Sequence, residues 1–153
     1  MQEIIVVCVV CKIIVKTIDK IKMCRGLSTM IYVEKGKEQE QFIAFIEYAI
    51  GILAEEKYAS FLKLFDSSRL TERDLLLALK YLDESRCAVK VDNPAQTKIK
   101  NQIININSFN DDSGYWIDYD LTTDGDFNDL TIQIEFLKQN NGYLVVLDDL
   151  HTL

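Results

Sequence analysis

The sequence is poor in several residue types, and each scarcity limits what kind of protein it can be. Its 153 residues include one proline, six glycines, one tryptophan and one histidine. Fibrous proteins need far more proline and glycine, so that class is excluded. No apolar run reaches the roughly 18 residues needed to cross a bilayer, so we expect neither a transmembrane protein nor a membrane partner. The remaining composition, 48% hydrophobic and 27% charged, is typical of one soluble globular domain.

Basic residues are almost absent from the C-terminal third of the chain. Residues 101–153 carry a net charge of −9, with Lys138 as their one basic side chain, whereas residues 1–30 carry +3 and residues 31–100 carry −1. A negative field repels phosphate backbones and attracts basic proteins or cations. We therefore expect no nucleic-acid binding and favour a basic protein partner; the alternative is an acidic surface that serves solubility alone.

The first 36 residues differ in composition from the rest, and we expect an N-terminal segment at 1–36 followed by a single domain at 37–153. The segment opens with an apolar run, but Glu3 and the lack of a small-residue cleavage site argue against a signal peptide. A buried strand, a short buried helix and an extension upstream of a start at Met23 or Met30 remain open. A further alternative is that this segment forms the contact of an oligomer, whose size the sequence leaves unknown.

Residues that build metal and catalytic sites are also few. Cys8 and Cys11 have C-x-x-C spacing, but Cys24 and Cys87 supply no second such pair, and a zinc site usually needs four ligands. We therefore expect four reduced, mostly buried thiols in a cytoplasmic protein, with no metal and no cofactor. His151 is expected to be a surface residue near the C-terminus. Because phosphate-binding glycine loops and common hydrolase motifs are absent, the sequence predicts no enzymatic activity.

Residues 37–83 have the periodicity of helices. Apolar residues at three- and four-residue spacing predict an amphipathic helix of about five turns from Lys37. A short helix is expected at 58–65, and the polar residues at 66–69 then break the pattern. Thr71 and Asp74 resemble a capping box that starts a third helix, expected at 72–83.

After Ser85 the period changes to two, which predicts strands. The expected strands are residues 87–91, 98–107, 115–121, 130–137 and 143–147. The Asn140-Asn141-Gly142 turn signal predicts a hairpin between the last two. Helices followed by an antiparallel meander of about four to five strands define an α+β domain.

The third expected strand carries the best candidate binding residues. Period two places Trp116, Asp118 and Asp120 on one face, while the other face of the strand is apolar. Tryptophan is a favoured anchor at protein interfaces, and aspartate can take arginine in bidentate geometry. The alternative is that Trp116 packs into the core and the aspartates are only solvated. The candidate partner-binding residues are Asp111, Asp112, Trp116, Asp118, Asp120, Asp124, Asp126 and Asp129.

The stretch at 120–131 has partial calcium-loop spacing. The twelfth position is Thr131 instead of the bidentate glutamate that such loops need, and the stretch joins two expected strands instead of two helices. We therefore favour a hairpin loop built on the Asp124-Gly125 pair, with weak cation binding left open.

Several stretches resemble a known group of proteins. Residues 58–71, 78–82, 116–121, 129–131 and 147–151 resemble small uncharacterised bacterial proteins, some of which are similar to immunity proteins of contact-dependent or polymorphic toxin systems. The order of helices before a curved sheet is also similar to the cone-shaped nuclear-transport-factor-like fold. The first resemblance implies a protein that binds and blocks a toxin domain, often a basic nuclease.

These observations lead to one functional hypothesis and one alternative. We expect a toxin-neutralising immunity protein that docks a basic toxin domain on the acidic surface between Asp111 and Asp129. The alternative is a small-ligand-binding protein or enzyme of the nuclear-transport-factor-like fold, with an apolar pocket between the long helix and the sheet.

Overall fold

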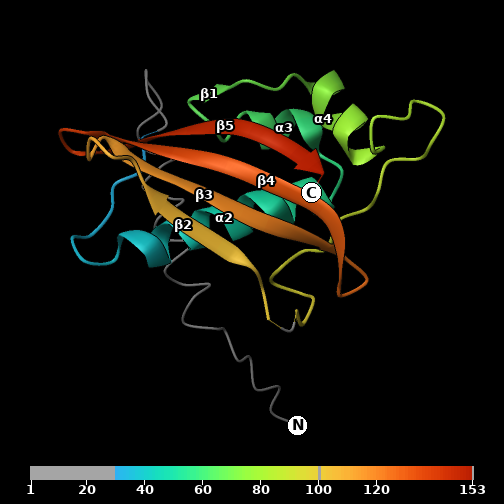
Figure 1. The fold of residues 1–153 in the computed structure, drawn as a ribbon, viewed down its shortest axis with the longest axis horizontal. Coiled ribbons are helices and arrows are strands. Elements are labelled where there is room, and N and C mark those ends of the chain that lie inside the picture. The colour runs from blue at the N-terminus through green and yellow to red at the C-terminus, as the bar shows by residue number, and fades with distance from the viewer. Residues whose placement is uncertain (1–29, 100, 153) are drawn as a thin grey trace, which may run out of the picture.

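The computed structural model describes residues 30–99 and 101–152, which form three helices and one sheet (Figure 1). In chain order the elements are α2 (Glu38–Ala54), α3 (Tyr58–Leu62), β1 (Ser67–Ser68), α4 (Glu72–Leu79), β2 (Ile104–Ser108), β3 (Gly114–Thr123), β4 (Asp126–Gln139) and β5 (Gly142–Thr152). The predicted α+β class, with helices before the sheet, is therefore confirmed. Most of the predicted N-terminal segment at 1–36, with Cys8, Cys11 and Cys24, lies outside the described residues. The predictions made for it therefore stay predictions.

The sheet is open and has the strand order β1-β5-β4-β3-β2. Strands β2 to β5 form the predicted antiparallel meander, each strand pairing with the next along the chain. The sheet is nevertheless mixed, because β1 pairs with β5 in parallel. The predicted meander is therefore present, and the sheet has one parallel edge strand in addition to it.

Strand β1 lies where the sequence predicted only a break between helices. The backbone N–H of Asp66 donates to the Val145 carbonyl at 2.8 Å, and the Asp66 carboxylate accepts from the Val145 N–H at 2.8 Å. These bonds hold residues 67 and 68 beside β5. Serines favour turns by local preference, and pairing with a strand almost eighty residues away overrides that preference.

Helix α2 lies along one face of the sheet, behind it in Figure 1, and closes the hydrophobic core. The Phe42 ring stacks on Phe136 of β4 with centroids 4.1 Å apart and meets Tyr143 of β5 edge-on at 4.9 Å. Ile46 and Ile50 follow on the same helical face and are fully buried. Burial of a large apolar side chain stabilises the fold by about 1.5–3 kcal/mol, which explains why the helical periodicity of this segment was informative.

The capping box at the start of α4 is confirmed. Thr71 Oγ1 accepts from the Asp74 N–H at 3.2 Å, and the Asp74 carboxylate accepts from the Thr71 N–H at 2.8 Å. The helix ends at Leu79, short of the predicted end at residue 83, because Tyr81 and Leu82 have φ values of 53° and 61°. This left-handed backbone cannot continue a right-handed helix.

The strand predicted at 87–91 is not formed. Residues 87–93 are irregular: the Val89 N–H donates to the Leu79 carbonyl at 2.8 Å, and the Asp92 N–H donates to the Thr122 carbonyl at 2.8 Å. Val91 is buried as a single apolar side chain. The segment therefore connects α4 to the end of β3, and the chain after it continues to β2 at the edge of the sheet opposite β1. Strand β2 correspondingly begins at Ile104 and not at residue 98.

Both tight hairpins predicted from turn residues are formed. Gln139 pairs with Gly142 around Asn140 and Asn141, which confirms the β4–β5 hairpin. Position 142 requires glycine for lack of space and not for its backbone conformation. A Cβ there would lie 2.4 Å from the carbonyl oxygen of Ile31, which forms a β-bridge with Tyr143.

No helix in the described ranges is both long and apolar enough to span a membrane.

Candidate functional site

The face of the sheet that is turned away from α2 carries polar rows set by strand register. We call this side the outer face. Asp118 of β3 lies opposite Gln133 of β4, which lies opposite Asp149 of β5. The next row is Asp120, Thr131 and His151, because side chains directly opposite each other in antiparallel strands share a face. The apolar side of β3 is buried, with Ile117, Tyr119 and Leu121 at 0–1% exposure, so the predicted assignment of its two faces is confirmed.

Two hydrogen bonds fix the aspartates of β3 in place. Gln133 Nε2 donates to Asp118 Oδ1 at 2.8 Å, and Thr131 Oγ1 donates to Asp120 Oδ1 at 2.6 Å. Asp118 is partly exposed, whereas Asp120 is 8% exposed. Of the two predicted carboxylates, Asp118 is therefore available to a partner, and Asp120 contributes mainly charge from beneath the surface.

Three further carboxylates join this face, and the sequence analysis did not single them out. Glu135 of β4 faces Trp116, and Asp148 and Asp149 come from β5. The register shifts between Gln133 and Ile134, so Asp148 is the extra residue of a β-bulge. The strict alternation of β4 could have placed Glu135 on the outer face. Nothing in the local sequence of β5 reveals the bulge that brings Asp148 to this face. The acidic face is defined by Asp118, Asp120, Glu135, Asp148 and Asp149.

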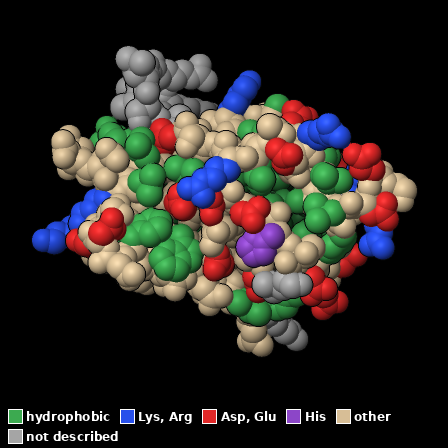
Figure 2. Space-filling model, turned by 45° about the horizontal axis from the view of Figure 1, so that its top comes forward, with side chains coloured by type: hydrophobic (Ala, Val, Ile, Leu, Met, Phe, Trp, Pro, Cys, Tyr) green, Lys and Arg blue, Asp and Glu red, His purple; other side chains and the backbone are tan. Residues whose placement is uncertain are grey.

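One cation lies among these carboxylates in the described part of the chain. Arg69, which follows β1, donates to Glu135 Oε2 at 3.3 Å and to Asp148 Oδ1. Its side chain is 62% exposed, while those of Glu135 and Asp148 are 14% and 16% exposed. The guanidinium thus covers two of the five carboxylates and leaves the acidic face with an excess of negative charge. Figure 2 shows that acidic side chains, in red, outnumber the blue basic ones on the face of the molecule seen there.

His151 lies on the outer face beside Asp149, in the row of Asp120 and Thr131. Its Nδ1 is 3.3 Å from Asp149 Oδ2, but this pair lacks the geometry of a hydrogen bond, so Nδ1 has no hydrogen-bond partner among the described residues. The side chain is 39% exposed, in agreement with the predicted surface position. Protonation of the imidazole would place a positive charge beside Asp149.

Trp116 forms an apolar patch at one end of the acidic face. Its ring is tilted against that of Phe109, with centroids 5.3 Å apart, and the side chain is partly buried. It lies opposite Asn107 of β2 and Glu135 of β4 and does not pack under the helices. Trp116 therefore adjoins the carboxylates on the face that the alternation of β3 predicted for it, and Phe109 is an aromatic neighbour that the sequence analysis did not include.

The other five candidate residues lie at the two ends of β3. Asp111 and Asp112 precede the strand, where hydrogen bonds from Ser113 lower the pKa of Asp111 and Lys138 Nζ lies 3.3 Å from Asp112. Asp124, Asp126 and Asp129 follow it in the β3–β4 hairpin and early β4. The expected continuous surface from Asp111 to Asp129 is therefore divided into three places, because a strand of this length separates its ends by roughly 30 Å.

The β3–β4 hairpin has the Asp-Gly turn that the sequence favoured over a calcium loop. Asp124 and Gly125 have φ values of 54° and 84°, as a tight turn of this type requires. The Asp92 carboxylate accepts from the N–H groups of both residues, at 3.0 and 2.8 Å, and from Thr122 Oγ1 at 2.7 Å. No group of three or more metal-ligating side chains is arranged for a metal ion in the described ranges.

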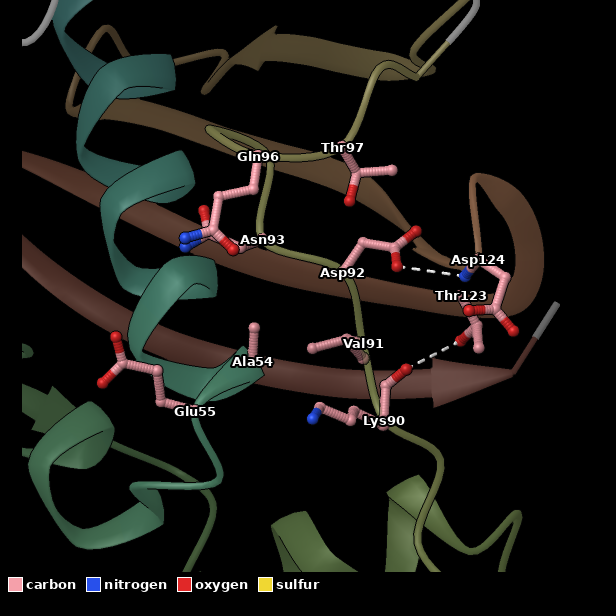
Figure 3. A pocket seen from close by; sticks show the side chains of 10 residues that line it. All are labelled: Ala54, Glu55, Lys90, Val91, Asp92, Asn93, Gln96, Thr97, Thr123 and Asp124. Atoms are coloured by element: carbon pink, nitrogen blue, oxygen red, sulfur yellow. Dashed lines mark hydrogen bonds between the residues drawn. The ribbon is translucent and has the colours of Figure 1, made fainter.

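A cavity of about 630 Å³ lies between the C-terminal end of α2, the segment at 90–97 and this hairpin (Figure 3). Most of its lining is polar, and the Asp92 carboxylate points from its floor to the Asp124 N–H. The lining residues are Ala54, Glu55, Lys90, Val91, Asp92, Asn93, Gln96, Thr97, Thr123 and Asp124.

Comparison with known proteins gives a family but no function. No curated protein and no solved structure matches the chain, so the similarity to the cone-shaped fold and to immunity proteins stays an expectation. One family model, DUF7668, described as a domain of unknown function, matches residues 50–153. That match includes α3, α4 and the whole sheet with its acidic face. Because the match covers more than half of the 153 residues, the chain belongs to the DUF7668 family.

Proposed function

We propose that this chain is a binding protein whose acidic face docks a basic surface of another protein, in the manner of an immunity protein that blocks a toxin domain. The observation that carries the proposal is the gathering of five carboxylates against one guanidinium on a sheet face that α2 leaves uncovered. The aromatic pair at the end of this face supports it, since buried aromatic anchors dominate the affinity of protein interfaces.

Docking on this face would neutralise the toxin by covering its active site. The carboxylates speed the encounter with a basic domain, because complementary charge raises association rates more than it raises affinity. Trp116 supplies apolar contact once the two surfaces meet. No reaction step is needed for such inhibition, which agrees with the expectation of a protein without enzymatic activity.

The test combines growth protection with binding kinetics. The chain is co-produced with the toxic C-terminal domain of a secreted protein encoded beside its gene, and association rates are measured at rising salt. The variant Asp118→Asn/Asp149→Asn should slow association about tenfold and weaken its salt dependence. The matched control Asp111→Asn/Asp126→Asn removes the same charge from the two ends of β3 and should change the rate far less. Equal effects of the two variants would reject the acidic face as the docking site.

A second candidate function rests on the cavity. Its volume of about 630 Å³ is within the range of small-molecule sites. However, it is lined mainly by polar groups and lies at the end of α2, whereas Phe42, Ile46 and Ile50 fill the space that was expected to hold an apolar pocket. Thermal-shift screening of small polar metabolites tests this candidate, and a hit must lose its effect in Thr97→Val or Lys90→Ala to support it.

A further inference from the structure

Among the described residues, strand β2 is the outermost strand at one edge of the sheet, and it carries no charged side chain. It reads Ile104-Asn105-Ile106-Asn107-Ser108, and Figure 1 shows it as the last strand of the sheet. Within the described ranges no strand pairs with its other side. Natural edge strands are usually protected from such pairing by lysine, proline, a bulge or a covering element. Strand β2 has neither a lysine nor a proline.

The outward main-chain groups of β2 follow from its pairing with β3. The Asp120 N–H donates to the Ile103 carbonyl, and the Phe109 N–H donates to the Gly114 carbonyl, so odd-numbered residues of this segment bond to β3. Hydrogen bonding alternates along an antiparallel strand. The N–H and C=O groups of Ile104, Ile106 and Ser108 therefore point away from the sheet and into the open edge.

The side chains of this edge are complementary to those of the same edge in a second copy of the chain, when the two strands pair antiparallel in one register. When Ile106 is placed opposite Ile106 of a second copy, Asn105 meets Asn107, and their amides can hydrogen-bond to each other. On the same side, Ile103, which is 44% exposed, meets Phe109. On the α2 side Ile104 meets Ser108. Residues 103–109, which make this contact, include no carboxylate and no ammonium group.

We propose that two copies of this chain pair through β2 across a two-fold axis at Ile106. The outward groups of Ile104, Ile106 and Ser108 would form about six main-chain hydrogen bonds, since they occupy the hydrogen-bonded positions of this register. The two sheets become one, and both acidic faces lie on the same side of it, because the axis is perpendicular to the sheet. The resulting dimer presents two docking surfaces to a partner.

Charge sets how tight this dimer can be. Each copy carries a net charge of −7, and Asp118 lies one strand from the contact, opposite Asn105. The two Asp118 residues are then about 16 Å apart, three strand spacings across the sheet and two residues along it, which exceeds the Debye length at physiological salt. We therefore expect a dimer of roughly micromolar affinity that strengthens as salt rises.

The experiment measures the mass of the full chain by sedimentation equilibrium over about 5–500 μM protein. The expected result is a concentration-dependent rise from 17.6 kDa towards twice that mass. Ser108→Pro removes an outward N–H while leaving the bonds to β3, and should raise the dimer dissociation constant at least about tenfold. Ser108→Ala is the matched control, because it removes the same side chain and keeps the N–H; it should leave the constant unchanged.

A second variant keeps the inference testable if the proline perturbs the strand. Asn105→Asp/Asn107→Asp leaves the backbone intact but places carboxylates opposite each other in this register, and it should abolish the dimer while circular dichroism stays native. A native chain that is monomeric at every concentration overturns the inference. So does a dimer that tolerates Ser108→Pro and the double aspartate variant, or one that Ser108→Ala weakens as much as Ser108→Pro. Growth protection tests the acidic face separately, so the two proposals can fail independently.

Discussion

At the scale of single residues, Asp92 shows how one carboxylate organises a turn far from it in sequence. It accepts hydrogen bonds from the N–H groups of Asp124 and Gly125 and from the Thr122 hydroxyl. Hydrogen bonds to charged groups are worth about 1.5–3 kcal/mol, and their loss leaves turn N–H groups without their partner. Asp92→Ala should therefore lower the free energy of unfolding by about 2 kcal/mol in urea denaturation.

The control for this prediction is Asp126→Ala in the same hairpin. Asp126 is exposed, so its replacement should change the free energy of unfolding by no more than about 0.5 kcal/mol. Similar losses in the two variants would show that Asp92 does not act through the turn.

Glu47 is a second residue whose environment has a measurable consequence. It is half-buried on α2, and burial raises its pKa above the ordinary value of 4.5. Because the pKa is raised only in the folded state, the contribution of this group to stability is present below pH 4.5 and is lost as the pH rises through the folded-state pKa. Glu47→Gln should increase the free energy of unfolding at neutral pH by roughly 0.5 kcal/mol, a small gain because water still solvates the half-buried carboxylate.

The gain from Glu47→Gln should disappear near pH 4, where the native carboxyl is itself protonated. Thermal or urea unfolding across this pH range is the measurement. Glu40→Gln on the exposed side of α2 is the control and should not stabilise the protein, since Glu40 lies in the first turn, where a negative charge is favourable. A gain that is independent of pH would contradict a desolvation effect.

At the scale of elements, Gly114 sets how closely β3 approaches β4. Its φ is 154°, and a Cβ there would lie 2.1 Å from the Phe136 carbonyl oxygen, a backbone atom that cannot move without distorting β4. Gly36 also has a positive φ, 86°, but a Cβ there meets nothing within 4 Å. Gly114→Ala should therefore cost about 3 kcal/mol or more, and Gly36→Ala about 1 kcal/mol.

The free energies of unfolding of Gly114→Ala and Gly36→Ala are compared by urea denaturation at one temperature. Because both variants add the same methyl group at a positive φ, the difference between them isolates the steric contact with β4. If Gly36→Ala costs as much as Gly114→Ala, backbone strain and not this contact explains the loss.

Elements specified by local signals were predicted well. Helix α2 follows its apolar periodicity, α4 starts at the capping box of Thr71 and Asp74, and the hairpin around Asn140 and Asn141 follows its turn residues. Elements that depend on distant partners were missed. Strand β1 exists because β5 is beside it. Residues 87–92 form no strand, because Val89 and Asp92 donate their N–H groups to Leu79 and Thr122.

The residues of the candidate site also fall into a group that the local sequence predicted and a group that only the pairing of strands brought together. Alternation along β3 was enough to place Trp116, Asp118 and Asp120 on one face. The register with β4 and the bulge in β5 bring Glu135, Asp148 and Asp149 to the same face, and β1 brings Arg69. Cross-strand register is not encoded in any single segment, so the sequence could not show that Asp111 and Asp124 lie apart from these residues.

At the scale of the whole molecule, the concentration of carboxylates on one face makes the stability of the fold depend on salt. The chain carries a net charge of −7, and five carboxylates share the acidic face with Arg69. Salt screens repulsion between partly exposed charges. The free energy of unfolding should therefore rise by about 1 kcal/mol between roughly 10 and 200 mM sodium chloride.

The measurement is urea denaturation at each salt concentration. Asp118→Asn/Asp149→Asn should reduce this salt dependence more than Asp111→Asn/Asp126→Asn, because the first pair lies within the acidic face. Identical salt slopes for the two variants would show that total charge, and not its location, governs the effect.

The sequence by itself determined the order of the three helices and of strands β2 to β5, the buried face of each long element and the excess of acid in the last third. These properties depend on the periodicity, turn residues and composition of contiguous segments. The tertiary structure decided which carboxylates share a face, which edge of the sheet stays open and where the cavity lies. Those features arise from pairing between residues distant in sequence, and the free energy of such pairing depends on the whole fold.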